Sequence, residues 1–431
     1  MNKINIGLLG YGIVGSGVIK MLGSRRAYFR EKYGVVFEVK AICDLRFKDK
    51  RPLIPGMKTR LTTDASEIIQ AEDIDVVVEL IGGLHPAKEF VEAALDQGKH
   101  VITANKALIA HFGQALFERA QKNQRSIYFE TSVLAGVPVI RPISEGLAGN
   151  TFNAIYGIVN GTCNFILSEM TRNHLSFADA LQLAQKNGFA EADPTLDISG
   201  GDSAHKLAVL TALAFGKFLP VKQIYTEGIT DISYDDIDHA ESLGLVIKLL
   251  TIAKKSGGDL EARVHPTLIP KDHPLALING VYNAVYLDAD PLGKVLISGE
   301  GAGQMAAASG VVSDLVNLAT RSADRPLLCN LFDDDNTLKY RTIDAIESKF
   351  YIRFMAMDQP GVLSKITGIL GRHQIGINSV AQKAHNKAQA VPVIMLTDYT
   401  TEKSLRVALT QIRQLSVIKS KPVAIRMEKL Q

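Results

Sequence analysis

Asp202 and Lys206 lie four residues apart, at the start of a run that is typical of an apolar helix. Side chains at positions i and i+4 share one face of a helix, so this carboxylate and this ammonium can point into the same space. A lysine held among carboxylates can pass a proton to or from a hydroxyl group. An exposed ion pair of little energetic value would have the same spacing, so the pair by itself leaves both interpretations open.

An acidic loop that contains glycines precedes this helix. Its acidic residues, within residues 191–202, are Glu191, Asp193, Asp197 and Asp202. Close carboxylates repel one another unless a cation answers them, and that cation could be calcium, a lysine or the amino group of a substrate. Calcium loops place oxygen ligands at alternate positions around a glycine, and this loop lacks that spacing. The loop therefore favours a polar wall that faces a substrate over a calcium site.

A glycine-rich turn near the N-terminus predicts a dinucleotide site. The sequence Gly10-Tyr11-Gly12-Ile13-Val14-Gly15 follows an apolar strand and opens a helix. The first glycine permits the tight turn, the second lets the backbone approach a pyrophosphate, and the third lets the helix pack on the strand. N–H groups at the helix start attract the phosphates. A second glycine turn, at 298–304, could bring Gly303 to the cofactor, although an ordinary strand-to-helix turn has the same pattern.

Asp44 ends the second predicted strand, where an acidic residue would bond the ribose hydroxyls. It lies 34 residues after Gly10, whereas the usual spacing is about 20 residues. An insertion near residues 24–34, in the first crossover, would explain the difference. Arg46 and Lys48 follow Asp44, and either could instead hold a 2′-phosphate, so the cofactor is NADP or NAD.

The rhythm of apolar runs predicts the elements that position these residues. In the first block, strands alternate with amphipathic helices, which is typical of a parallel sheet with crossover helices. We predict strands at 4–10, 37–44, 75–81, 99–103 and 126–130, and helices at 86–97 and 105–122. The second block opens with a helical stretch and continues through several helices, with strands at 154–159, 260–269, 281–288 and 294–298.

The third block has the order βαββαβ, which is the ferredoxin-like arrangement. Its strands are predicted at 349–357, 375–383, 389–397 and 422–428, and its helices at 361–373 and 402–414. The predicted fold class is therefore α/β. It comprises a Rossmann-type parallel-sheet domain at 1–135, an α+β catalytic domain with an open sheet at 136–320, a linker at 321–346, and the ferredoxin-like domain at 347–431.

Composition excludes several classes of protein. The chain has 431 residues, a formal net charge of +3 and 22% charged residues, with no basic block interleaved with aromatics, so we expect no nucleic-acid partner. We expect no membrane partner either, because no apolar stretch is long enough to span a bilayer and glycines break the N-terminal apolar run. Three widely spaced cysteines, Cys43, Cys163 and Cys329, fit a reduced cytoplasm.

The run from residue 184 to residue 206 resembles the signature of the homoserine dehydrogenases. In that signature alanine and glycine precede Asp-Pro, a further aspartate, and then Gly-x-Asp-x-x-x-Lys. The matching positions are Ala184, Gly188, Asp193, Pro194, Asp197, Gly200, Asp202 and Lys206. Further family-like segments follow the expected order along nearly the whole chain, at 10–15, 103–108, 130–133, 160–164 and 299–303, and the C-terminal block resembles an ACT domain.

The resemblance implies a reversible, NAD(P)-dependent interconversion of L-homoserine and L-aspartate 4-semialdehyde. It makes Lys206 the proton donor to the forming alkoxide and places Lys106 at the substrate or the nicotinamide. Substrate contacts are implied for Glu191, which would face the amino group, and for Asp202, Asp197 and Thr162. Cofactor contacts are implied for Gly10, Gly12, Ile13, Val14, Gly15, Asp44, Arg46, Thr103, Lys106, Gly188 and Gly303.

Family members also carry a monovalent-cation site (Na+), bound largely through backbone oxygens. The matching positions here are Glu130, Val133, Ala135 and Val137. Two departures bear on the family's geometry. The usual glycine run after the valine reads Leu-Ala-Gly at 134–136, and the helix after the second glycine turn begins Gln-Met-Ala, where Pro-Thr-Ala is more usual.

Two other functions remain open from the sequence. Cys163 could serve as the nucleophile of a thiol-dependent semialdehyde dehydrogenase, which would need a nearby base. The chain could also be an amino-acid sensor on a Rossmann scaffold that has lost its activity. The presence of Lys206, Asp202 and Glu191 argues against an inactive site. Since ACT domains often pair and bind amino acids, we expect a homo-oligomer, a dimer or tetramer, with threonine as a feedback effector. The segment 358–363, at the first strand-to-helix turn of the ACT-like block, contains Pro-Gly. A tight turn alone would also explain this pair of residues.

Overall fold

A computed structural model describes residues 2–46, 59–256, 258–321, 338–382 and 390–430. Lys48, Cys329 and most of the predicted linker lie outside the described residues. The chain forms two compact units, and each unit is assembled from three separate segments. The first contains Met1–Asn153, Ala204–Lys222 and Tyr282–Thr337, and the second contains Ala154–Ser203, Gln223–Val281 and Leu338–Gln431. Since both units are discontinuous in sequence, the predicted boundaries between the four segments stay predictions.

The first unit contains a parallel sheet of six strands in the order β3-β2-β1-β4-β5-β6. This is the doubly wound order of dinucleotide-binding domains, so the predicted Rossmann-type sheet is confirmed. Only the short edge strand β3 was missed, because three mostly exposed residues carry no apolar run. The strands are β1 (Asn2–Leu9), β2 (Val35–Cys43), β3 (Arg60–Thr62), β4 (Val76–Glu79), β5 (His100–Thr103) and β6 (Ile127–Tyr128).

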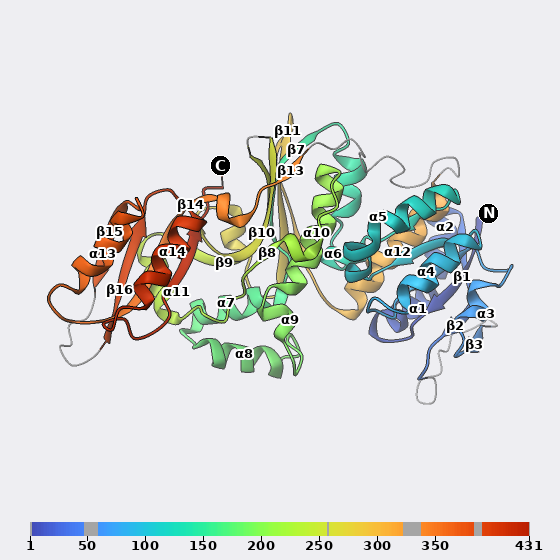
Figure 1. Cartoon of the computed structure of the whole chain (residues 1–431). Helices are drawn as coiled ribbons and strands as arrows, with labels where there is room; N and C mark the ends of the chain where they lie inside the picture. Colours follow the sequence, from blue (N-terminus) through green and yellow to red (C-terminus); the bar gives the residue numbers. More distant parts are fainter. Residues whose placement is uncertain (1, 47–58, 257, 322–337, 383–389, 431) are drawn as a thin grey trace. The chain divides into compact units, whose positions relative to one another are not determined.

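The helices of this unit are α1 (Ile13–Ser24), α2 (Arg26–Tyr33), α3 (Ser66–Ile69), α4 (Ala87–Asp96), α5 (Lys106–Lys122), α6 (Thr131–Leu134), the π turn η2 (Pro142–Gly146) and α12 (Gln304–Thr320). Strands β11 (Tyr282–Asp290) and β12 (Gly293–Glu300) pair as an antiparallel hairpin. Although α12 is remote in sequence, it packs directly on α1 (Figure 1), where a Cβ on Gly17 would lie 2.9 Å from the Gln304 side chain. Its Val311 and Leu315 are buried in one core with β1 and β2.

The second unit contains strands of the middle and C-terminal blocks joined in one sheet, in the order β7-β9-β10-β18-β14-β16-β15. These are β7 (Thr151–Ile158), β9 (Leu245–Ser256), β10 (Asp259–Pro270), β14 (Glu347–Met357), β15 (Ile377–Gln382), β16 (Ala390–Thr397) and β18 (Val423–Met427). Two short strands, β8 (Tyr225–Thr226) and β13 (Lys339–Tyr340), pair with β10, and β17 (Thr400–Thr401) pairs with β14. The junction is parallel pairing of β18 with β10.

Strand β9 was not predicted, and the expectation of helices up to the strand at 260–269 was wrong there. Its apolar run is as long as a helix, so its periodicity does not separate the two structures. Twelve residues of β9 pair with β10 in an antiparallel ladder. The tertiary partner therefore decides the conformation of this segment.

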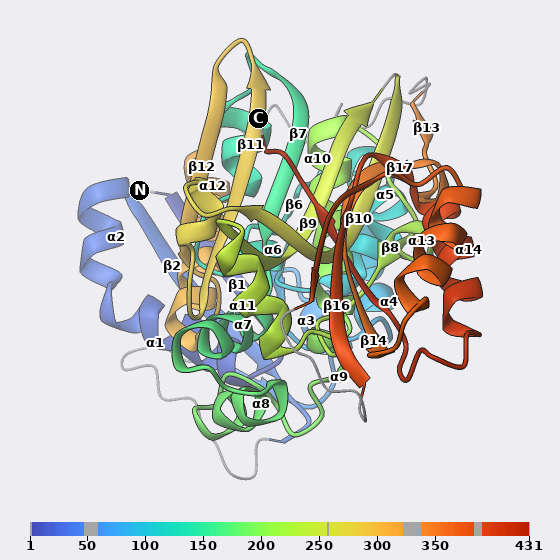
Figure 2. The same cartoon turned by 90° about the vertical axis from the view of Figure 1, so that its left-hand side faces the viewer.

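The remaining helices are α7 (Gly161–Asn173), α8 (Phe177–Lys186), α9 (Thr195–Ile198), α10 (Gly201–Phe215), η3 (Val221–Gln223), α11 (Tyr234–Ser242), η4 (Pro274–Leu277), η5 (Ile343–Ala345), α13 (Val362–Arg372) and α14 (Glu402–Arg413). Figure 2 shows α13 and α14 on the same side of β14 and β16, and their apolar faces share one core with β14. The order β14-α13-β15-β16-α14-β18 confirms the predicted βαββαβ arrangement. Among the described residues, no helix has the length and apolar character needed to cross a membrane.

Candidate active site

The glycine turn between β1 and α1 has the geometry of a phosphate-binding turn. Gly10 has a φ of +98°, and a Cβ there would lie 2.7 Å from the carbonyl oxygen of Leu80. A Cβ on Gly15 would lie 2.2 Å from the carbonyl oxygen of Gly10, so the third glycine permits the helix to approach the turn. Around Gly12, by contrast, no described atom lies within 4 Å of the Cβ position. The turn therefore leaves space at the α1 N-terminus for a pyrophosphate.

Asp44 follows β2 and ties the glycine turn to the next loop. Its Oδ2 accepts a hydrogen bond from the backbone N–H of Tyr11 at 2.7 Å, and its Oδ1 accepts one from Arg46 N at 2.7 Å. A carboxylate offers about four acceptor sites, so Asp44 can also receive ribose hydroxyls. Helix α2 occupies the first crossover, which confirms the predicted insertion and explains the long spacing from Gly10.

Two residues at the carboxyl ends of β4 and β5 organise the loops around Lys106. The Thr103 hydroxyl donates to Oε2 of Glu79 at 2.6 Å, and Oε1 of Glu79 accepts from Ile81 N at 2.9 Å. Burial raises the pKa of Glu79. Asn105 caps α5, so Lys106 is fixed as its first residue. Glu79 was not predicted as a site residue, although an acidic residue at the end of an apolar strand was a usable signal in the sequence.

The second glycine turn lies beside the first helix of the nucleotide-type sheet. Gly303 has a φ of +118° and precedes the first residue of α12. The side-chain amide of Gln304 donates to the Ser16 hydroxyl in α1 at 2.9 Å. The predicted cofactor residue Gly303 is thus brought next to α1, and Gln304, which replaces the more usual proline, makes the connecting contact.

In the second unit, Asn160 gathers two of the predicted substrate carboxylates. Its Nδ2 donates to Oδ1 of Asp197 at 2.8 Å and to Oδ2 of Asp202 at 2.9 Å. Its Oδ1 accepts from Cys163 N at 2.8 Å and thereby caps α7. One amide therefore joins three separate segments. Asn160 lies in the family-like segment at 160–164, but its role was not predicted. The only signal for that role was a polar residue between a strand and a helix.

The other predicted substrate residues surround the same loop. The Thr162 hydroxyl donates to the carbonyl oxygen of Phe189 at 2.6 Å and so holds the loop that follows α8. Gly188, with a φ of +75°, lets the chain turn sharply at the end of α8. The Glu191 side chain is exposed, and its backbone oxygen accepts from Gln185 Nε2 at 3.1 Å.

Asp202 and Lys206 lie one turn apart in α10, as the spacing predicts. Both are buried, with 4% of Asp202 and 8% of Lys206 exposed. The alternative of a solvent-exposed ion pair is therefore wrong. Buried charged side chains are costly unless they are paired or serve a function, which makes this turn of α10 a candidate catalytic element.

The predicted cation site fits the structure poorly at its side chain. Oε1 of Glu130 accepts from the backbone N–H groups of Val139 at 2.6 Å and Ile140 at 2.7 Å, while Oε2 pairs with Arg141 Nε at 3.0 Å. The Glu130 carboxylate is thus neutralised by its own chain. Its backbone N–H donates to Asp314, whose pKa is raised by burial and by the nearby Glu130 charge. No step of the chemistry is assigned to a cation here.

The backbone positions of that site remain a prediction. Val133 lies in α6, and Ala135 adopts a positive φ of 52°, which places its carbonyl close to α12. The Val137 side chain lies against Gly299, where an added Cβ would be 2.7 Å from Cγ2 of Val137. Among the residues that the structure describes, no cluster of three or more His, Cys, Asp or Glu side chains could hold a metal ion.

Cys163 has the environment of a structural cysteine. Its side chain is fully buried, and its Sγ donates to the carbonyl oxygen of Asp197 at 3.2 Å. A catalytic thiol acts as a partly exposed thiolate. The contact instead ties α7 to the turn that carries Asp197.

Three family models match the chain. The model of the homoserine dehydrogenase NAD-binding domain matches residues 10–130, the homoserine dehydrogenase model matches residues 138–316, and the ACT domain model matches residues 350–417. The first match contains the glycine turn, the second contains α10, and the third lies within the βαββαβ block.

Relatives match over the full length. A homoserine dehydrogenase of Neisseria gonorrhoeae is 40% identical over 435 residues, with 100% of both chains covered, and one of Pseudomonas aeruginosa is 40% identical with the same coverage. A solved homoserine dehydrogenase of Thiobacillus denitrificans is 39% identical with a TM-score of 0.92, covering 100% of this chain and 99% of the other. A hyperthermophilic archaeal homoserine dehydrogenase in complex with NADPH is 27% identical with a TM-score of 0.62, covering 74% and 98%.

Proposed function

Because this chain belongs to the homoserine dehydrogenase family, we propose that it interconverts L-homoserine and L-aspartate 4-semialdehyde with Lys206 as the proton donor and acceptor. The family membership makes it an NAD(P)-dependent oxidoreductase. The observation that carries the assignment of roles is the burial of Asp202 and Lys206 on one turn of α10.

The chemistry of the reaction explains why a lysine is needed. The bound nicotinamide supplies the hydride in the reducing direction and accepts it in the other. Reduction of an aldehyde places negative charge on its oxygen, which a positioned ammonium stabilises and protonates. Lys206 is suited to this role because the helix fixes its backbone and burial excludes competing water. Lys106, at the first residue of α5, would hold the substrate or the nicotinamide end.

The carboxylates are suited to the polar end of the amino-acid substrate. Asp197 and Asp202 are oriented by Asn160, and a carboxylate has enough acceptor sites to receive a substrate group as well. Glu191 would face the amino group. Thr162 would act through the loop that its hydroxyl holds at Phe189.

The cofactor would lie on the glycine turn, with Gly12 closest to the pyrophosphate and Asp44 at the ribose. Ile13 and Val14 begin α1 and would offer N–H groups to the phosphates. Thr103 and Gly303 border the same region, and Gly188 would contribute from the loop after α8. Arg46 is the described residue that would favour NADP by binding its 2′-phosphate.

We further propose regulation by threonine at the ACT domain, in a cytoplasmic homo-oligomer that serves threonine, methionine and isoleucine biosynthesis. The support is the ACT match and the confirmed βαββαβ order. A Na+ ion bound by the backbone oxygens of Val133, Ala135 and Val137 remains part of this proposal without a role in the chemistry.

Initial rates of homoserine oxidation test these proposals together. Wild-type protein should reduce NADP or NAD in the presence of homoserine, and threonine should slow the reaction. A protein lacking residues 345–431 provides a comparison only if it remains folded, because β18 belongs to the sheet of the second unit. Binding of homoserine without any turnover would contradict the enzymatic proposal and favour the sensor. Unchanged rates in millimolar threonine would contradict the regulatory one.

A further inference from the structure

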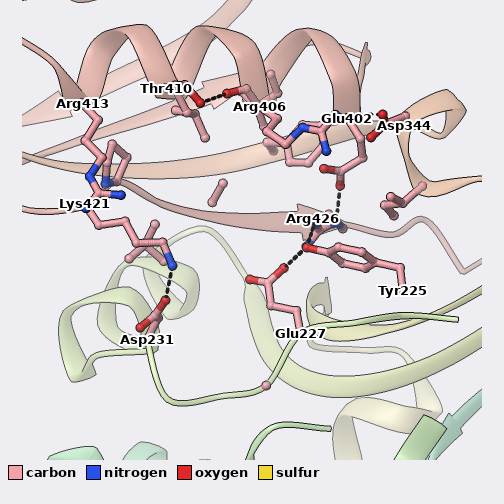
Figure 3. A pocket seen from close by; sticks show the side chains of 18 of the residues that line it. Tyr225, Glu227, Asp231, Asp344, Glu402, Arg406, Thr410, Arg413, Lys421 and Arg426 are labelled. Atoms are coloured by element: carbon pink, nitrogen blue, oxygen red, sulfur yellow. Dashed lines mark hydrogen bonds and ion pairs between the residues drawn. The ribbon is translucent and has the colours of Figure 1, made fainter. Parts of the chain in front are cut away.

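The C-terminal strand β18 places a buried arginine against residues 225–232 of the middle block, where the short strand β8 continues into a loop (together called the loop 225–232). Only 5% of Arg426 is exposed. Its Nη1 donates to Oε2 of Glu227 at 2.7 Å, its Nη2 donates to the Tyr225 hydroxyl at 3.0 Å, and its Nε donates to Glu402 in α14. Figure 3 shows Arg426 between Glu402 on one side and Glu227 and Tyr225 on the other. The guanidinium also lies 4.9 Å from the centre of the Tyr225 ring.

The loop that receives Arg426 is packed backbone to backbone on the turn between α9 and α10. A Cβ on Gly228 would lie 1.9 Å from the carbonyl oxygen of Ile198 and 2.6 Å from Cα of Ser199. The next residue, Ile229, donates its N–H to that same Ile198 oxygen at 2.9 Å. No side chain other than hydrogen fits at Gly228, so any shift of the loop 225–232 must move the turn or break this contact.

That turn lies between the two carboxylates that Asn160 gathers. Asp197 precedes Ile198, and Asp202 is the second residue of α10, on the other side of the turn. The hydrogen bonds from Asn160 to both carboxylates, at 2.8 and 2.9 Å, require the turn to keep its present shape. A continuous set of short contacts therefore runs from Arg426 through Glu227, Gly228 and Ile198 to Asp202, all within the second unit.

We propose that Arg426 is a positioning residue for the substrate carboxylates: it fixes Glu227, and through Gly228 it fixes the turn that presents Asp197 and Asp202. The C-terminal domain then contributes to substrate binding without touching the substrate. This inference rests on the proposed function, because it gives Asp202 the role of a substrate ligand.

The choice of arginine supports a positioning role. A guanidinium holds several acceptors in one fixed plane, whereas a lysine ammonium on a flexible stem does not. Glu402 and Glu227 come from different parts of the chain, so the planar fork sets the distance between α14 and the loop 225–232. A buried charge of this kind is weak evidence for stability in itself, and orientation is the better-supported reason for its presence.

A second ion pair on the same loop provides a matched control. A cavity of about 350 Å³ between α14, β18 and the loop 225–232 is lined by both pairs (Figure 3). Lys421 pairs with Asp231 at 2.8 Å, and these side chains are 65% and 57% exposed. Because exposed pairs contribute little, removing this one changes charge at the cavity without moving the loop.

The test compares Glu227→Gln, Arg426→Met and Gly228→Ala with the control Lys421→Met. Displacement of a positioned group by about 1 Å can lower the efficiency of an enzyme by about 100-fold. We therefore expect the Michaelis constant for homoserine to rise by about 10- to 100-fold in the first three variants. The dissociation constant of NADPH should stay unchanged, since the glycine turn is in the other unit. Lys421→Met should behave as wild type, and Arg426→Lys should recover part of the affinity that Arg426→Met loses.

Two further readouts keep the outcome decisive. If Arg426→Met or Gly228→Ala fails to fold, Glu227→Gln decides, because 37% of the Glu227 side chain is exposed and its loss is tolerable. An unchanged homoserine Michaelis constant in Glu227→Gln would overturn the inference. If wild-type protein does not oxidise homoserine, the proposed function fails instead. Amide exchange of residues 195–203 then still tests the coupling, which requires faster exchange in Glu227→Gln than in Lys421→Met.

Discussion

In the cofactor region, which comprises the glycine turn at residues 10–15, the important contacts are made by the backbone. Gly12 leaves open space, and Gly15 lets α1 approach Gly10 closely. In the substrate region, which comprises Asn160, Asp197 and Asp202, the geometry comes instead from side chains that meet across about 40 residues of chain. The two regions should therefore respond differently to substitution: the first to added volume, the second to lost hydrogen bonds.

Adding volume to the glycine turn is expected to have the larger effect. No described atom lies within 4 Å of a Cβ at position 12, so Gly12→Val should fold. Its side chain would fill the space proposed for the pyrophosphate, so its affinity for NADPH should fall by about 100-fold. Gly15→Val should instead destabilise the first unit by about 3 kcal/mol, because its Cβ would overlap the Gly10 carbonyl. Nucleotide fluorescence and thermal unfolding would separate these outcomes. Equal losses of stability in both variants would contradict the expected difference between Gly12, which borders open space, and Gly15, which packs on Gly10.

Removing the shared amide of Asn160 should affect only the substrate region. A hydrogen bond to a charged group contributes about 1.5–3 kcal/mol, so Asn160→Ala should raise the homoserine Michaelis constant by about 10- to 100-fold. Asn160→Asp should be worse than Asn160→Ala, because a third carboxylate would face Asp197 and Asp202. NADPH binding is the internal control and should be unaffected. An equal loss of NADPH affinity would contradict the separation of the two regions.

The pH dependence of stability should show a smaller effect, which comes from a buried lysine elsewhere in the second unit. Burial lowers the pKa of Lys248 to about 8, and its Nζ donates to Asn164 Oδ1 at 3.2 Å, Asn279 Oδ1 at 2.9 Å and Ile278 O at 2.5 Å. An unfolded lysine keeps its proton up to a pKa of about 10.4, so between these values the unfolded state binds more protons and stability rises with pH.

Lys248→Met removes this titration. Relative to the variant, wild-type protein should gain about 1–3 kcal/mol in free energy of unfolding between pH 7.5 and pH 10, as measured by chemical denaturation. A constant difference between the two proteins across that range would show that the buried lysine does not titrate as described. The full penalty of burying the charge is present at and below neutral pH.

Features carried by local sequence could be predicted, while features made by distant partners could not. The glycine turn, the α10 pair and the βαββαβ order depend on spacing within short segments, and the structure contains all three. The role of Asn160 depends on partners 37 and 42 residues away. Similarly, β9 is a strand because β10 pairs with it. Helix α12, from the end of the second block, packs into the same core as the nucleotide-type sheet.

The loss of Lys206 tests the central claim most directly, since the claim separates cofactor binding from proton transfer. Lys206→Ala should bind NADPH with wild-type affinity, while kcat for homoserine oxidation falls by about 10²- to 10⁴-fold, the usual contribution of a general acid–base group. Turnover within a few-fold of wild type at saturating homoserine would contradict the account. So would a loss of activity that is matched by an equal loss of NADPH binding.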